Sequence, residues 1–241
     1  MMPSGVADFA IKVRAQFSEA MEPTRNNPAD LLPATDRLGE AEPLMRRALA
    51  IHERSFGSDH PVVARDLDNL ATLLQVTKRL VEAEPLLRRA LAIDEQSFGP
   101  DHPNVAIRLN NLATLLQDSN RTAEAEPLIR RALAIDERSL GPDHLDVATD
   151  LDYLADLLRS TNRAAEAEPL IWRALAIDER SFGPDHPLVA IRLSNFGMML
   201  KKLGNVTGAR GLLVRAFRIL RDSLGEDHPW TRTVKANLES L

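Results

Sequence analysis

The sequence predicts an all-α protein, a right-handed solenoid built from antiparallel helix pairs. Two observations predict this fold class. A pattern of residues returns every 42 positions, and each 42-residue unit contains two separate stripes of apolar residues at helical spacing. One such unit cannot bury its own apolar face, so neighbouring units must stack to form a continuous core.

Two motifs define the repeat and keep their spacing along most of the 241-residue chain. One is Ala-Glu-Pro-Leu, which begins at Ala41, Ala83, Ala125 and Ala167. The other is a glycine, then one further residue, then Asp-His. Its histidines are His60, His102, His144, His186 and His228. Because the spacing is constant at every boundary, the chain is interpreted as a single array of repeats.

Each unit is predicted to form two antiparallel helices. The first helix should begin at Asp-His-Pro, because Asp or His caps a helix and proline is tolerated in the first turn. In the unit that starts at residue 103, the second helix should accept Pro127 in its first turns and end at Gly141 in a left-handed conformation. Small residues such as Ala125 and Ala132 let the units approach closely. The two apolar stripes of this unit are Val105, Leu109, Leu112, Leu115 and Leu116, then Leu128, Ile129, Ala132, Leu133 and Ile135.

The repeat divides the chain into consecutive segments. Residues 1–24 are expected to form a helical segment. Pro28 and Pro33 interrupt the next first helix, so residues 25–60 are expected to be a degenerate repeat. Its residues 25–38 are expected to be a degraded first helix, such as a loop with a helical turn. The following segments are repeats over residues 61–102, 103–144, 145–186 and 187–228 and a C-terminal capping helix over residues 229–241.

Composition limits the classes of partner. The formal net charge is −5 and no stretch collects basic residues, which argues against nucleic acid as a partner. The chain has no cysteine, which excludes disulfides and thiolate metal sites and is compatible with a cytoplasmic location. No segment approaches the ~20 apolar residues of a membrane-spanning helix, and the first residues lack a signal-peptide core.

Catalytic and metal sites are not expected. The five histidines recur one per unit, and stacked helices lie ~8–10 Å apart, whereas a metal needs ligands at ~2 Å. They are therefore interpreted as helix caps. Asp150 and Asp152 are two residues apart and do not face each other on a helix. The sequence thus predicts a protein that is not an enzyme and has no cofactor.

The second helices carry arginine pairs, beginning at Arg46, Arg88 and Arg130. Because Glu42, Glu84 and Glu126 stand one turn earlier, these arginines are predicted to form a solvated, partly paired convex face. Trp172 replaces the first arginine in its unit. Two interpretations of Trp172 stay open, as an exposed anchor for a partner or as a side chain folded over a neighbouring helix.

The repeats resemble those of a known family. The spacing of Leu67, Leu70, Ala71, Leu74, Ala83, Leu87 and Ala90 is similar to the tetratricopeptide consensus, with leucine in place of its tryptophan and tyrosine. The 42-residue length and phrases such as HPNVAIRLNNLATLL and AEPLIRRALAIDERSLGPDH resemble the light chain of kinesin and its bacterial relatives, over roughly residues 38–241. The resemblance implies a protein-interaction scaffold whose first helices line a concave groove that receives a peptide or partner protein.

The resemblance also suggests candidate peptide-binding residues. In that family an asparagine on the first helix often reaches the ligand, and the matching positions here are Asn69, Asn111, Tyr153, Asn195 and Asn237. Tyr153 breaks the series, and an alternative is that the asparagines hydrogen-bond between helices. Residues nearby vary between units, and the basic ones complete the candidate set: Arg65, Arg108, Arg159, Arg192 and Lys201. Arg108 and Arg192 are expected to attract an acidic peptide.

Two other functions are compatible with the pattern. The array ends could mediate homo-oligomer formation, through an apolar stripe of Val234, Leu238 and Leu241. The chain could also be the recruiting portion of a larger multidomain protein or enzyme. Residues 1–24, with Phe9, Val13 and Phe17, could pack on the first unit or lie in the groove.

Overall fold

The computed structural model describes residues 32–241, and the side chains of residues 41–241. Within these residues the chain forms ten α-helices and no strand. The helices are α2 (Leu32–Phe56), α3 (Pro61–Val76), α4 (Leu80–Phe98), α5 (Pro103–Asp118), α6 (Thr122–Ser139), α7 (Leu145–Ser160), α8 (Ala164–Phe182), α9 (Pro187–Lys202), α10 (Val206–Leu224) and α11 (Pro229–Glu239).

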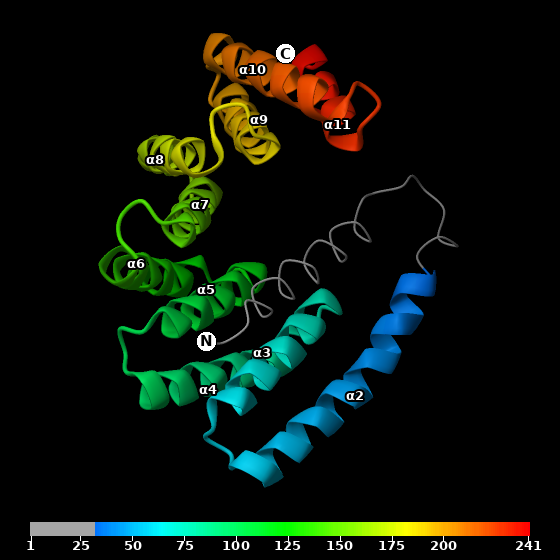
Figure 1. Cartoon of the computed structure of the whole chain (residues 1–241), viewed down its shortest axis with the longest axis vertical. Coiled ribbons are helices and arrows are strands. Elements are labelled where there is room, and N and C mark those ends of the chain that lie inside the picture. The colour runs from blue at the N-terminus through cyan, green and yellow to red at the C-terminus, as the bar shows by residue number, and fades with distance from the viewer. Residues whose placement is uncertain (1–31) are drawn as a thin grey trace.

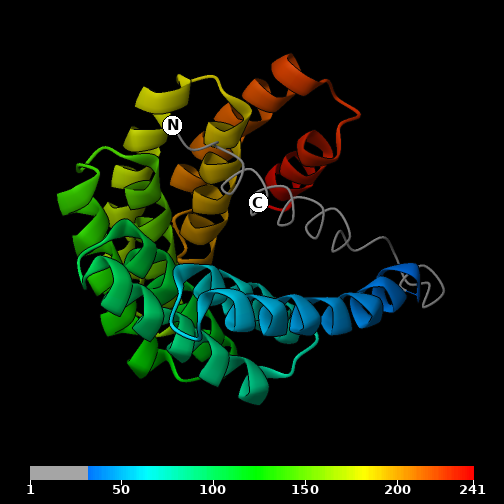
Figure 2. The ribbon, with the colours of Figure 1, turned by 60° about the horizontal axis from the view of Figure 1, so that its bottom comes forward.

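The helices stack as antiparallel pairs along a curved array (Figures 1 and 2). The pairs are α3/α4, α5/α6, α7/α8 and α9/α10, and each pair contacts the next. In Figure 1, α5, α7 and α9 lie on the inner side of the arc, whereas α6 and α8 lie on its outer side. The first helix of each unit therefore faces the concave side.

The N-terminal end of the array differs from the sequence prediction. Residues 32–38 were expected in a loop with a helical turn, but they belong to α2, one continuous helix of 25 residues. Pro33 is the second residue of α2, where its missing N–H costs nothing. Gly39 and Pro43 follow, and α2 accommodates both in its interior. Residues 1–24, for which a helical segment was expected, and residues 25–31 lie outside the described part of the chain.

Histidine caps start the first helices. In α3, α5, α7, α9 and α11 the N-cap is a histidine, and its Nδ1 accepts a hydrogen bond at 3.1–3.2 Å from the backbone N–H two residues later. Phe98 stacks on the His102 ring with a centroid distance of 4.7 Å. The cap prediction is therefore confirmed, with His rather than Asp as the acceptor.

Glycine ends several of the second helices. Gly99, the C-cap of α4, has φ 89° and ψ 158°, which lies beyond the left-handed helical region expected from the sequence and is essentially restricted to glycine. Gly141 follows α6 with φ 93°. The chain can therefore reverse sharply before each Asp-His cap.

Alanine and leucine form one continuous core. Ala83, Ala125 and Ala167 are fully buried on the second helices, and they belong to a cluster that extends from Leu70 to Ala209. At Gly197 on α9, an added Cβ would lie 2.8 Å from Leu213 Cγ, so α9 and α10 approach more closely than a side chain would permit. Stacking thus depends on small residues at fixed positions in each unit.

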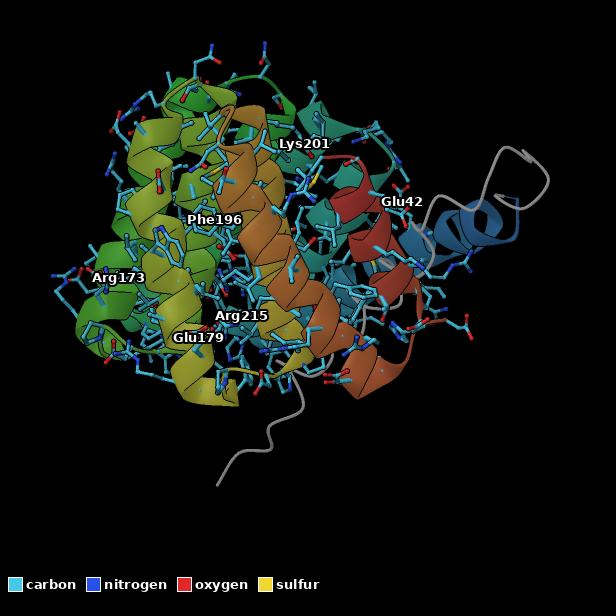
Figure 3. All side chains as sticks on the ribbon, turned by 90° about the horizontal axis from the view of Figure 1, so that it is seen from above. Glu42, Arg173, Glu179, Phe196, Lys201 and Arg215 are labelled. Atoms are coloured by element: carbon cyan, nitrogen blue, oxygen red, sulfur yellow. The ribbon has the colours of Figure 1, made fainter. Side chains whose placement is uncertain are left out.

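Ion pairs link the second helices on the outer side. Arg121 contacts Glu84 of the preceding unit at 2.7 Å and Glu124 of its own helix at 2.7 Å. Hydrogen bonds from Arg121 and Arg88 lower the pKa of Glu84. The predicted Glu84/Arg88 pair is present at 2.7 Å. Figure 3 labels Glu179 and Arg215, which pair in the same manner at 2.6 Å between α8 and α10.

Helix α11 covers the C-terminal end of the array. Val234 is buried and belongs to a cluster with Leu213 of α10 and Leu193 of α9. Leu238 and Leu241 pack against this cluster. The apolar stripe that was expected to be exposed for self-association therefore faces inward. Within the described residues, no helix is long and apolar enough to cross a membrane.

Candidate functional site

The candidate asparagines occupy different environments on the first helices. Asn111 donates to both carboxylate oxygens of Asp68, at 2.9 and 3.0 Å, and so connects α5 to α3. Asn237 donates to Ser194 Oγ at 3.3 Å and connects α11 to α9. Asn195 is exposed and makes no side-chain hydrogen bond within the described residues. Of these three, only Asn195 is free to contact a ligand.

The two other members of the series lie at the edges of the core. Asn69 is half-buried on α3. Tyr153, on α7, is half-buried and packs against the central apolar cluster. Neither residue lines a pocket with Asn195.

Arg108 is held inside the array. Its Nε donates to Asp94 Oδ2 at 2.8 Å, and its Nη1 lies 2.9 Å from Asp68 Oδ2. Only 11% of the side chain is exposed. Because two carboxylates already neutralise this guanidinium, the structure does not support the expectation that Arg108 attracts an acidic peptide.

Arg192 repeats this arrangement two units later. Its Nε donates to Asp178 at 2.6 Å, and its Nη1 pairs with Asp152. The side chain is 13% exposed. Arg192 on α9 thus connects to α8 and α7 of the preceding unit, as Arg108 on α5 connects to α4 and α3. Its charge is therefore also neutralised within the fold.

An acidic pair takes the place of this arrangement in the unit between them. Asp150 has the same position in its unit as Arg108 and Arg192, and it accepts a hydrogen bond from Asn110 Nδ2. Burial raises the pKa of Asp150 to about 8 and that of Asp136 to about 6, and the two carboxyl groups repel each other when both are ionised. A proton shared within the pair removes this repulsion.

These contacts form a series that we call the polar ladder, and the sequence analysis missed it. Its members are His52 with Asp66, Arg108 with Asp94 and Asp68, Asp150 with Asp136 and Asn110, and Arg192 with Asp178 and Asp152. The signal in the sequence is the alternation of acid and base at residues 66, 108, 150 and 192. The partners are 14 residues earlier in the chain or about one unit away, so a search within single helices does not find them.

The remaining basic candidates have weaker or local partners. Arg65 is exposed and lies 3.7 Å from Asp66. Arg159 pairs with Asp156 at 2.8 Å on the same helix. Lys201 donates to Ser240 at 2.8 Å, so it holds the end of α9 against the end of α11. Of these three, Arg159 is the one that lines the pocket described next.

A pocket of about 360 Å³ lies among α7, α8 and α9. Three of the sequence-predicted residues line it, namely Arg159, Arg192 and Asn195. Asp152, Asp156 and Thr149 line the α7 side. Ligand pockets have volumes of roughly 300–1,000 Å³, so this one is large enough for one or two bulky side chains.

Two large aromatic residues meet at this junction. Phe196 replaces the leucine of the other units and contacts Trp172 edge to face, with ring centroids 4.8 Å apart. Trp172 is 46% exposed, so it both folds over α9 and presents surface to solvent. Phe196 also lines the pocket, so this aromatic pair helps to shape it.

Metal binding has no support in this geometry. In the part of the chain that the structure describes, no group of three or more His, Asp or Glu side chains is placed to hold a metal ion. The polar ladder is built from hydrogen-bonded pairs and ion pairs, and its residues serve contacts between helices.

Comparison with protein families agrees with the helix-pair architecture. Two models described as tetratricopeptide repeat match the sequence, one over residues 67–138 and 109–179 and the other over residues 24–62 and 189–229. The chain belongs to the tetratricopeptide repeat family. No curated protein sequence matches it.

Solved structures share the tetratricopeptide repeat fold of this chain. One, from Podosopora anserina, is described as kinesin light chain nearly identical TPR-like repeats; it is 22% identical, with a TM-score of 0.67 over 88% of this chain and 97% of that chain. Another, BtubC (BKLC) from P. vanneervenii, is 22% identical, with a TM-score of 0.71 over 86% of this chain and 82% of that chain. The predicted α-solenoid of antiparallel helix pairs and the resemblance drawn from the sequence are confirmed.

Proposed function

We propose that this tetratricopeptide repeat protein is a non-catalytic scaffold that binds a peptide or partner protein in the concave groove of its first helices. One observation carries the proposal. Asn195 has the same position in its unit as Asn111. Asn111 is bonded to Asp68, whereas Asn195 is exposed and lines a pocket that combines apolar and charged side chains. A polar group without a partner beside apolar contact surface is typical of a peptide-binding site. We place the scaffold in the cytoplasm, with protein rather than nucleic acid as its partner.

The array offers a matched pair of variants that tests this site. Ile191 and Ile107 have the same position in their units, on α9 and α5. Ile191 lines the pocket, whereas Ile107 does not and is 52% exposed. A glutamate at either position adds the same charge to the same face of a first helix, but only Ile191→Glu places it in the pocket.

The experiment selects peptides from a random displayed library on the intact chain and measures their affinities by fluorescence anisotropy. We expect Ile191→Glu to weaken binding by at least about tenfold, or ~1.4 kcal/mol, because a buried charge would replace apolar contact surface. Ile107→Glu should stay within about twofold of the parent. Circular dichroism verifies that both variants are folded. Equal losses in the two variants, or none in either, would contradict peptide binding at this pocket.

A further inference from the structure

The charged residues of the pocket are not balanced. Three carboxylates line it, Asp152, Asp156 and Asp178, against two guanidinium groups, Arg159 and Arg192. The excess of one negative charge is fixed by the sequence of this junction. Because the concave protein surface has a low dielectric constant, it strengthens the electric field that this excess negative charge exerts on a ligand entering the pocket.

Two of the three carboxylates are also the most accessible charges in the pocket. The exposed fractions of the side chains are 69% for Asp156 and 45% for Asp152, but 30% for Arg159 and 13% for Arg192. The side chain of Asp178 is only 7% exposed, and its carboxylate is paired with Arg192. A ligand that enters the pocket therefore meets carboxylate oxygens before it meets guanidinium groups.

Asp152 remains ionised near neutral pH. Burial raises its pKa to about 6, and Arg192 opposes this shift. At pH 7.5 the ionised form of Asp152 therefore predominates.

Apolar side chains form the opposite wall. Leu188 and Ile191 of α9 face the pocket together with Phe182 of α8 and Phe196. Leu188 is 43% exposed and Phe182 is 37% exposed, so both have surface that a ligand can cover. An occupant that matches this site combines a bulky apolar side chain with a neighbouring positive charge.

We infer that the pocket among α7, α8 and α9 binds a peptide segment in which a large apolar side chain, such as tryptophan, is next to lysine or arginine. The apolar side chain packs on Leu188, Ile191 and Phe182. The basic side chain pairs with Asp156, which is 69% exposed and which Arg159 also contacts at 2.8 Å, so the ligand competes with Arg159 for this carboxylate. This inference rests on the proposed function, because it names the chemical class of peptide that the groove accepts.

The repeat supplies variants that remove these charges with little risk to folding. Asp156 stands where other units have Thr72 and Thr114, and Arg159 stands where they have Gln75 and Gln117. Asp156→Thr and Arg159→Gln therefore introduce residues that this scaffold already carries at equivalent positions. The charged pair occurs in this unit and not in those two.

The test uses two fluorescein-labelled peptides that differ only in charge, Ser-Gly-Trp-Lys-Lys-Gly-Ser and Ser-Gly-Trp-Glu-Glu-Gly-Ser, titrated by anisotropy at pH 7.5. We expect the lysine peptide to bind about three- to tenfold more tightly at low salt, since accessible ion pairs each contribute modestly. The preference should shrink in 0.5 M NaCl through screening. Asp156→Thr should weaken the lysine peptide about threefold, and Arg159→Gln should leave it unchanged or strengthen it.

The possible failures are distinguishable. Tighter binding of the glutamate peptide, no effect of Asp156→Thr on the lysine peptide, or no binding of either peptide would overturn the inference of a basic ligand. The proposed function would then be decided separately, by the library-selected peptides and the comparison of Ile191→Glu with Ile107→Glu. If those selected peptides bind and respond only to Ile191→Glu, the groove is a peptide site of another chemistry.

Discussion

A single residue, Asp150, is the least favourable member of the polar ladder. It lies 1% exposed at a position where the neighbouring units have Arg108 and Arg192, and its carboxyl group meets Asp136. Asp136 Oδ1 and Asp150 Oδ2 have no hydrogen-bond partner. At neutral pH either the pair holds a proton, or two buried, ionised carboxylates repel each other.

This arrangement predicts a pH dependence of stability. Both pKa values are raised above the ordinary value of 3.8, so the folded chain holds protons that the unfolded chain releases. The stabilisation of the folded chain by the protonated pair is complete below about pH 4, and it is lost as the pH rises through 6 to 8. Asp150→Asn should therefore raise the free energy of unfolding by roughly 2 kcal/mol at pH 8, with a smaller gain at pH 5. Urea titrations across this pH range measure the difference.

Asp101 provides the control, because it is 66% exposed and pairs with Arg138 at the surface. Asp101→Asn should change stability little at either pH. If Asp150→Asn destabilised the chain at pH 8, the two carboxyl groups would not be in conflict and the interpretation of the ladder would be wrong.

At the scale of the element, histidine caps decide where the first helices begin. His102 Nδ1 accepts a hydrogen bond from the backbone N–H of Asn104 at 3.1 Å. His102→Ala removes this acceptor and should lower the free energy of unfolding by about 1 kcal/mol. His102→Asn, which retains an acceptor, should recover a large part of this loss in urea unfolding. Equal losses for Ala and Asn would show that the Phe98 stacking matters more than the cap.

The elements also show what a sequence pattern can predict. The helix pairs followed from apolar periodicity and from the spacing of Asp-His and Pro, because these signals are local to a helix. The loop expected at residues 32–38 was wrong, since Pro33 at a helix start and Pro33 as a helix breaker look alike in a sequence. Helix α2 shows that the position of a proline relative to the helix start decides its effect.

The candidate site was predicted only in part, for a different reason. Asn195, Arg159 and Arg192 were each predicted as residues of the groove, and all three line the pocket. The neutralisation of Arg108 and Arg192 was not foreseen, because it requires carboxylates from two other helices. The pocket itself depends on the size of Phe196 and Trp172, and residue size acts through packing rather than through any local pattern.

At the scale of the whole molecule, the array is stabilised by contacts between neighbours, so its end units depend on what covers them. Removal of residues 226–241 would expose the partners of Val234 and remove the contact from Lys201 to Ser240. We expect amide hydrogen exchange in α9 and α10 to accelerate by about tenfold or more, while α3 to α6 keep their protection. A uniform acceleration along the chain would instead indicate that the array unfolds as one cooperative unit.

The alternation within the polar ladder also limits how this array can change in length. Odd and even units are not equivalent, because acids at residues 66 and 150 alternate with bases at residues 108 and 192. Loss of residues 103–144 would bring Asp68 and Asp94 against Asp150, three acids with no base. Loss of residues 103–186 would bring the same two acids against Arg192, as they now meet Arg108. Loss of residues 103–144 alone should therefore be tolerated less well than loss of residues 103–186, because only the longer deletion keeps a base against these two acids.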